Sequence, residues 1–117
     1  MTLGLSDHEV DSETHVVELG GEIDLYTAPE FRSRMVELID AGKTHLIVDL
    51  SEVTYIDSTA LGVLLGGLKR AHEARGSLAL VCAGQNVVEV VRTAGLERDF
   101  PIYETREEAL DAVAEGV

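Results

Sequence analysis

The fold is decided by one stretch of sequence, residues 45–68, which reads HLIVDLSEVTYIDSTALGVLLGGL. Its first part, His45–Leu50, is a nearly continuous apolar run, which is typical of a strand with both faces covered. After Ser58, leucines recur at the three- and four-residue spacing of an amphipathic helix. A buried strand followed at once by an apolar helix predicts an α/β domain.

Strand-like and helix-like segments alternate on both sides of this stretch. The predicted elements are a strand at His15–Leu19 that ends in a turn at Gly20–Gly21, a helix from Thr27 to Gly42, a strand at His45–Leu50, a helix from Ser58 to Arg75, a strand at Ser77–Cys82, a helix ending at Gly95, a short strand at Pro101–Tyr103 and a final helix after Thr105. Thr27 and Thr105 each stand three residues before a glutamate, which is the spacing of an N-terminal capping box. With no linker, repeat or low-complexity tract, the order predicts a single domain over residues 1–117. We expect an α/β fold with one mixed sheet of about four to five strands and helices packed on it.

The composition describes an acidic chain with an aliphatic core. Of 117 residues, 45% are hydrophobic but only 4% aromatic, and 22 Asp and Glu against nine Lys and Arg give a formal net charge of −13. Nucleic acids and anionic membranes both attract basic surfaces, so neither is expected as a direct partner. No apolar stretch approaches the ~20 residues of a membrane span, and the N-terminus has no signal-peptide pattern. Because the single cysteine, Cys82, cannot form an internal disulfide, we expect a soluble protein of the reducing cytoplasm.

Residue types that carry catalysis or bind metals form no recognisable motif. The histidines are scattered, without HxH, HExxH or paired-cysteine spacing, and neither a GxSxG elbow nor a P-loop is present. Cys82 lies among apolar residues of a predicted strand, where a buried inert thiol is expected. We therefore expect no catalytic residue, no metal and no cofactor, and a protein that is not an enzyme.

Two alternatives in which an aspartate carries the chemistry are weaker. Asp49, near a strand end, could be the phosphorylated residue of a two-component receiver, with Glu9 and Asp11 as its metal-binding acids. Receivers, however, place a lysine at the end of their fifth strand, and neither lysine of this chain stands in such a place. A small hydrolase that uses Asp49 and Asp57 is the least favoured function.

Asp57 and Ser58 stand at the start of the predicted apolar helix. Either residue could be a simple N-cap that accepts hydrogen bonds from first-turn N–H groups. The same position also suits a phosphate, because free N–H groups and the helix dipole both favour an anion there. The local sequence permits both interpretations.

Gly62 and Gly66 lie four residues apart inside this helix, and hence on one face of it. Each glycine costs about 1 kcal/mol of helix stability relative to alanine, so something must approach that face closely. Either the sheet beneath or a partner protein could do so, and packing against the sheet is the favoured interpretation.

Three segments together resemble one protein family. They are GGEIDLYTAP at residues 20–29, DLSEVTYIDSTALGVLLG at residues 49–66 and VRTAGL at residues 91–96. In order and spacing they resemble bacterial anti-sigma factor antagonists (anti-anti-sigma factors) of the STAS-domain family, in particular the stress-response and sporulation types. The resemblance covers nearly the whole chain and implies a single STAS domain over residues 1–117.

The resemblance implies a transcription regulator that works by partner switching. The unphosphorylated form binds an anti-sigma factor that is also a serine kinase of the GHKL ATPase type, and so releases a sigma factor. The kinase phosphorylates the serine that matches Ser58, and the antagonist then dissociates. A PP2C-type serine phosphatase restores the binding form.

The resemblance also implies a partner-binding surface. Asp24 matches an acid at the kinase-binding surface of the family. An acid just before a helix is usually a surface charge, and we expect Asp24 to lie beside the turn that carries Ser58. Asp57, Thr59 and Gly62 complete the expected partner-binding residues.

One residue departs from the family pattern. Ala60 stands where members commonly have glycine, and its methyl group is expected to crowd the approach of the kinase. The alternative function is a STAS interaction module of another assembly, such as a stressosome-like scaffold or a lipid-transport complex. The presence of Ser58 favours the switch.

Overall fold

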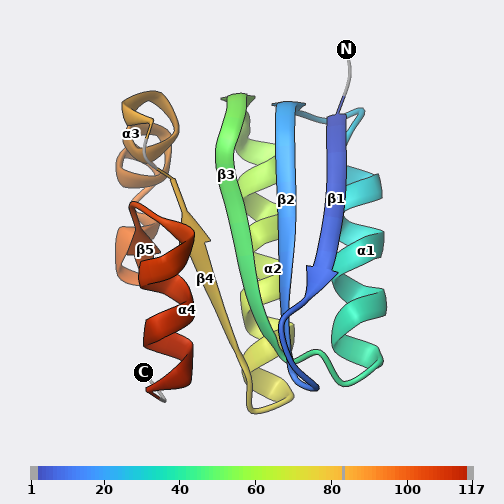
Figure 1. Ribbon diagram of the computed structural model, residues 1–117. Coiled ribbons are helices and arrows are strands. Elements are labelled where there is room, and N and C mark those ends of the chain that lie inside the picture. Colours follow the sequence, from blue (N-terminus) through green and yellow to red (C-terminus); the bar gives the residue numbers. More distant parts are fainter. Residues whose placement is uncertain (1–2, 83, 116–117) are drawn as a thin grey trace.

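The computed structural model describes residues 3–82 and 84–115 (Figure 1). Its elements are β1 (Leu3–Glu9), β2 (Thr14–Ile23), α1 (Ala28–Asp40), β3 (His45–Ile56), α2 (Ser58–Glu73), β4 (Ser77–Val81), α3 (Gln85–Thr93), the 3-10 helix η1 (Leu96–Arg98), β5 (Ile102–Tyr103) and α4 (Arg106–Ala114). The alternation confirms the predicted α/β fold class. In this described part of the chain, no helix is long and apolar enough to cross a membrane.

Among the described residues, five strands form one mixed sheet in the order β1-β2-β3-β4-β5. β1 and β2 form an antiparallel hairpin, whereas β2, β3, β4 and β5 run parallel. Figure 1 shows α1 and α2 side by side behind the sheet, with α3 beside the upper end of β3. Because parallel neighbours end at the same edge of a sheet, the loops that follow β2 and β3 meet there. These loops carry Asp24 and Ser58.

Two apolar clusters, one on each face of the sheet, hold the layers together. The larger lies between the sheet and helices α1, α2 and α3, and its fully buried members include Val17, Leu19, Ile23, Phe31, Met35, Leu46, Leu50, Leu64, Leu78 and Leu80. The smaller lies beneath α4 and consists of Val16, Ile47, Val81 and Ala109. Burying one such aliphatic side chain contributes about 1.5–3 kcal/mol, so an aliphatic core suffices without tryptophan.

The glycine pair Gly20–Gly21 lies inside a strand, and the turn predicted there is wrong. β2 continues to Ile23 and stays paired with β3, but the register of the pairing shifts beside both glycines. Gly21 has a φ of +87°, a left-handed conformation that glycine adopts without strain. The pair therefore forms an irregularity of the bulge type, and β2 runs on until the Asp24 loop reaches the end of β3.

The two predicted capping boxes have different outcomes. At the start of α4, the Thr105 hydroxyl accepts a hydrogen bond from the Glu108 N–H over 3.2 Å, as predicted. At the start of α1, Thr27 makes no such bond, and its hydroxyl donates instead to the Glu22 carbonyl over 2.9 Å. The Thr27 prediction is wrong because its hydroxyl oxygen accepts instead from the Asp24 N–H, over 2.9 Å, on the side of the chain before the helix.

A charged cluster fastens β1 to α1. The Arg34 guanidinium donates to both carboxylate oxygens of Asp7, over 2.7 and 2.8 Å, and His15 Nε2 lies 2.7 Å from Asp7 Oδ1. The hydrogen bond from Arg34 is the main reason that the pKa of Asp7 lies well below its usual range. The edge strand β1 is thus held by a bidentate ion pair as well as by its pairing with β2.

This cluster predicts that acid weakens the fold through Asp7. Its pKa is lower in the folded chain than in the unfolded one, so its contribution is complete above the unfolded-state value of about 3.9 and fades as the pH falls. We expect Asp7→Asn to lower the free energy of unfolding by about 1–3 kcal/mol at pH 6. In urea titrations, the difference from wild type should shrink between pH 6 and pH 3. A difference for Asp7→Asn that stays constant over this pH range would contradict the assignment.

Candidate functional site

Ser58 is the first residue of α2, exposed at the end of β3. The residue before it, Asp57, is the N-cap: its carboxylate accepts from the Ala60 N–H over 3.0 Å, and its carbonyl accepts from the Leu61 N–H over 3.1 Å. Of the two candidate N-caps, the structure therefore assigns the cap to Asp57. No hydrogen bond within residues 3–82 and 84–115 uses the Ser58 hydroxyl, which is left available at the helix N-terminus.

The loop after β2 lies directly beside the start of α2. Ile23 at the end of β2 is paired with Ile56 at the end of β3, and the Asp57 N–H donates to the Ile23 carbonyl over 3.2 Å. The predicted adjacency of Asp24 and the turn that carries Ser58 is confirmed. Both loops project from the sheet edge at the top of Figure 1.

Asp24 is buried, which corrects the expectation of a surface charge. Asp24 is only 5% exposed. Its Oδ1 accepts hydrogen bonds from the Tyr26 N–H over 2.9 Å and from the Thr27 N–H over 3.1 Å. Oδ2 is buried with no hydrogen-bond partner among the described residues. The carboxylate turned inward because the tight loop before α1 needs an acceptor for its N–H groups. Asp24 thus shapes the loop that presents Leu25 and Tyr26.

Two substitutions of Asp24 should distinguish the role of its acceptor oxygen from the role of its negative charge. Asp24→Ala leaves two loop N–H groups without their acceptor, so we expect it to lower the free energy of unfolding by about 2–3 kcal/mol. Asp24→Asn keeps an acceptor oxygen in the same place and should retain most of the stability. Thermal and urea unfolding measure both effects. Equal losses for the two variants would show that the negative charge, not the acceptor, holds the loop.

Three large side chains are exposed around this edge. Leu25 is 60% exposed, Tyr26 81% and Tyr55 50%, and Tyr55 pairs in register with Glu22, two residues before Asp24. We call these three residues the Tyr26 patch. Sequence reasoning missed them, although two large apolar residues in succession in a short loop were a usable signal. Exposed aromatic residues gathered at one edge are typical of a protein-binding surface.

The glycines of α2 divide into two kinds. A Cβ added at Gly67 would lie 2.8 Å from Met35 Sδ and 3.2 Å from Leu78 Cδ1, so this glycine permits close packing of α2 on α1 and β4. A Cβ added at Gly62 or Gly66 would meet no atom within 4 Å. The favoured packing interpretation is therefore wrong for Gly62 and Gly66, which face open space.

Ala60 does not crowd the approach to Ser58. Ala60 is 0% exposed and belongs to the main core, on the side of α2 that faces the sheet. Ala60 shares a helix face with Leu64 and Leu68, at the four-residue spacing of buried positions. The expectation of a steric obstacle is wrong because the methyl group points into the protein.

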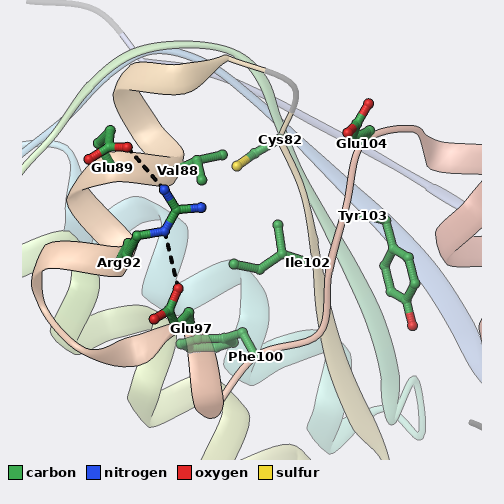
Figure 2. Close-up of a pocket in the computed structure, with 9 residues that line it drawn as sticks. All are labelled: Cys82, Val88, Glu89, Arg92, Glu97, Phe100, Ile102, Tyr103 and Glu104. Atoms are coloured by element: carbon green, nitrogen blue, oxygen red, sulfur yellow. Dashed lines mark hydrogen bonds and ion pairs between the residues drawn. The ribbon is translucent and has the colours of Figure 1, made fainter.

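A cavity of about 560 Å³ lies between α3, η1 and β5 (Figure 2). It is lined by Cys82, Val88, Glu89, Arg92, Glu97, Phe100, Ile102, Tyr103 and Glu104. Figure 2 shows Arg92 between Glu89 and Glu97, with hydrogen bonds of 3.0 and 3.2 Å. Cys82 is 2% exposed and burial raises the pKa of its thiol, which confirms a buried inert cysteine. Neither the arginine nor the thiol is poised for catalysis.

The aspartates considered for catalysis do not converge. Burial opposes ionisation of Asp49, but hydrogen bonds from Ser51 and Arg106 outweigh it, so its pKa lies below the ordinary value. Asp57 follows eight residues later along the same extended segment, about 26 Å away at ~3.3 Å per residue. Paired carboxylates need to be much closer than this. In the described ranges, no group of three or more His, Cys, Asp and Glu side chains is placed to hold a metal ion.

Comparison with known proteins supports the resemblance seen in the sequence. The sequence profile described as the STAS domain matches residues 7–109. The anti-sigma-B factor antagonist of Bacillus subtilis (strain 168) is 37% identical over 81 residues, 69% of this chain and 73% of that protein. An anti-sigma factor antagonist structure from Mycobacterium paratuberculosis aligns with a TM-score of 0.88 at 27% identity, covering 97% of this chain and 95% of the other. The structure of the anti-sigma factor antagonist SpoIIAA in its unphosphorylated form aligns with a TM-score of 0.82 at 25% identity, over 97% and 98% of the two chains.

Proposed function

The chain belongs to the STAS-domain family and, within it, to the anti-sigma factor antagonists, which are non-enzymatic regulators; from that premise we propose that it works by partner switching at Ser58. The unphosphorylated chain binds an anti-sigma factor that is also a GHKL-type serine kinase, and so frees a sigma factor. The kinase transfers the γ-phosphoryl group of ATP to the Ser58 oxygen, the hydroxyl proton is lost, and ADP is the leaving group. The antagonist dissociates, and a PP2C-type phosphatase restores it by hydrolysis.

The observation that carries this proposal is the free state of the Ser58 hydroxyl. Because Asp57 caps the helix, phosphorylation of Ser58 removes no hydrogen bond from the described fold. SpoIIAA, whose structure resembles this one, has been solved in a form described as unphosphorylated and in a form described as phosphorylated. An exposed, uncommitted serine in the Asp-Ser motif is the natural acceptor here.

The helix N-terminus can hold the added phosphate without refolding. Asp57 already satisfies the N–H groups of Ala60 and Leu61, while those of Ser58 and Thr59 have no partner among the described residues. These N–H groups and the helix dipole favour an anion. Phosphorylation adds about −1.5 to −2 charges to a chain that already carries −13, so the effect must act locally, on the partner group opposite Ser58.

The partner surface of this proposal centres on the start of α2. Asp57 and Thr59 flank the phosphoacceptor, and the Tyr26 patch gives this edge exposed aromatic area. Aromatic side chains often supply much of the binding energy at protein interfaces. In this arrangement Asp24 acts as a positioning residue, because its buried carboxylate orients the loop that presents Tyr26.

Mapping the phosphate tests the proposal. The chain is incubated with ATP and each GHKL-type anti-sigma factor of its own organism, and the products are analysed by mass spectrometry after proteolysis. We expect one phosphate, on Ser58, and none in Ser58→Ala. A phosphate on Thr59 or Ser51, or no phosphate with any of these kinases, would overturn the assignment.

A further inference from the structure

A groove runs between α1 and α2 on the face of the molecule away from the sheet. It encloses about 210 Å³ and is lined by Arg32, Met35, Val36, Ile39, Thr59, Gly62, Val63, Gly66, Gly67 and Arg70. On each helix these residues recur at three- and four-residue spacing, so two parallel helical stripes face each other. Figure 1 shows the two helices side by side over most of their length. Four of the lining residues carry apolar side chains, namely Met35, Val36, Ile39 and Val63.

The shape of the groove depends on two glycines that the fold itself does not need. Gly62 and Gly66 are exposed, and an added Cβ at either would meet nothing within 4 Å. Alanine would make a more stable helix at both positions. Because glycine has no side chain, the surface of α2 is recessed at these two positions. The backbone of another helix can therefore approach closely.

The charge at the two ends of the groove differs from that of the chain as a whole. The protein carries a formal charge of −13, yet the groove has Arg32 at one end and Arg70 at the other and no acid in its lining. Arg32 forms no ion pair within the described ranges, and the exposed bond from Arg70 to Asp40 is long, at 3.3 Å. A groove with apolar side chains along its middle and a cation at each end is complementary to an apolar segment flanked by acids.

We propose that this groove binds an amphipathic helix of the anti-sigma factor, with apolar side chains along one face and an acidic residue near each end. The inference rests on the proposed function. It names the structural element of the anti-sigma factor that would contact part of the partner-binding surface. From Thr59 to Arg70 the groove spans about 17 Å at 1.5 Å per residue, enough for about three turns of a docked helix. Thr59 lines the groove and adjoins Ser58, so a helix docked here places the partner next to the phosphoacceptor.

Filling the groove gives the sharpest test. The probe is the anti-sigma factor kinase that phosphorylates Ser58 of the wild-type chain, and affinity is measured by calorimetric titration with ADP present. Gly66→Leu fills the groove, whereas His72→Leu adds the same side chain to an exposed position of α2 that does not line it. We expect Gly66→Leu to weaken binding at least 10-fold and His72→Leu less than 2-fold.

Two further variants test the close approach and the charges. Gly62→Ala combined with Gly66→Ala should raise the melting temperature by several degrees and still weaken binding at least 5-fold. Arg32→Glu combined with Arg70→Glu should weaken binding at least 10-fold. Its control, Lys69→Glu combined with Arg98→Glu, makes the same change of net charge at exposed positions outside the groove.

The outcomes separate this inference from the function on which it rests. Weaker binding of the groove variants with normal binding of their controls supports the docked helix. Wild-type binding by all groove variants, with Ser58 still phosphorylated, overturns the docked helix and leaves partner switching intact. If sedimentation shows a wild-type dimer that Gly66→Leu dissociates, the occupant is a second copy of this chain, and the inference is likewise overturned.

Discussion

Replacing Ser58 with aspartate should weaken binding of the anti-sigma factor by about 30–150-fold, equivalent to about 2–3 kcal/mol. The new carboxylate stands beside the Asp57 carboxylate at the start of α2 and meets the partner group that faces the Ser58 hydroxyl. Ser58→Ala should bind as the unphosphorylated wild type does, and it should stay bound when ATP replaces ADP.

The control variant for this prediction introduces the same negative charge at a position far from Ser58. Ser12 is exposed in the hairpin between β1 and β2, at the sheet edge opposite the loop that follows β2. Ser12→Asp should bind within about 2-fold of wild type, because a charge beyond the Debye length of about 8 Å is largely screened. Equal weakening by Ser12→Asp and Ser58→Asp would mean that net charge, not the local contact, governs affinity.

Replacing Gly76 with alanine should lower the free energy of unfolding by about 3 kcal/mol or more. A Cβ at this position would lie 1.9 Å from the Thr44 carbonyl oxygen and 2.5 Å from the Thr44 carbonyl carbon. The same oxygen accepts from the Ser77 N–H over 3.0 Å, so relieving the overlap breaks the contact that aligns β3 with β4.

The matched substitution is Gly66→Ala, which should raise the free energy of unfolding instead of lowering it. An added Cβ there meets nothing within 4 Å, and alanine favours the helix by up to about 1 kcal/mol. Urea unfolding of both variants measures the contrast. A loss smaller than 1 kcal/mol for Gly76→Ala would show that the α2–β4 junction relaxes to admit the methyl group.

Hydrophobic spacing was sufficient to predict the central elements. The apolar run at the start of β3, the leucines of α2 and the run of β4 each fit one structure, because burial on these faces is the dominant energy. The order of elements then implied a mixed sheet, and the loops after β2 and β3 had to meet at one edge. The resemblance to the family predicted that Asp24 lies beside Ser58, and the parallel pairing of β2 with β3 explains why it does.

Glycine was harder to interpret, because one residue type serves several purposes. Gly20–Gly21 fitted a turn and a bulge equally well, and only the pairing of β2 with β3 decides between them. Gly76 follows the end of α2, but the left-handed residue there is Arg75, with a φ of +64°. Gly76 is instead required by the close approach of Thr44. Such contacts come from segments distant in sequence, so local patterns cannot show them.

Side-chain direction at the candidate site was the other limit. The sequence placed Asp24 correctly in a loop beside Ser58, but it could not show that the carboxylate turns inward to accept loop N–H groups. Ala60 was a partial exception, since its four-residue spacing to Leu64 already indicated the buried face of α2. The open space above Gly62 and Gly66 became visible only once α1 was in place.

The affinity of the two phosphorylation states for one partner tests the central claim most directly. The chain is prepared unphosphorylated and phosphorylated on Ser58, with the site verified by mass spectrometry, and each form is titrated into the anti-sigma factor kinase with ADP present. Circular dichroism should give the same spectrum for both forms, since the phosphate sits at a helix N-terminus that suits it. We predict that the phosphorylated form binds about 30–150-fold more weakly. Equal affinities of the two forms, with their folds intact, would contradict partner switching at Ser58.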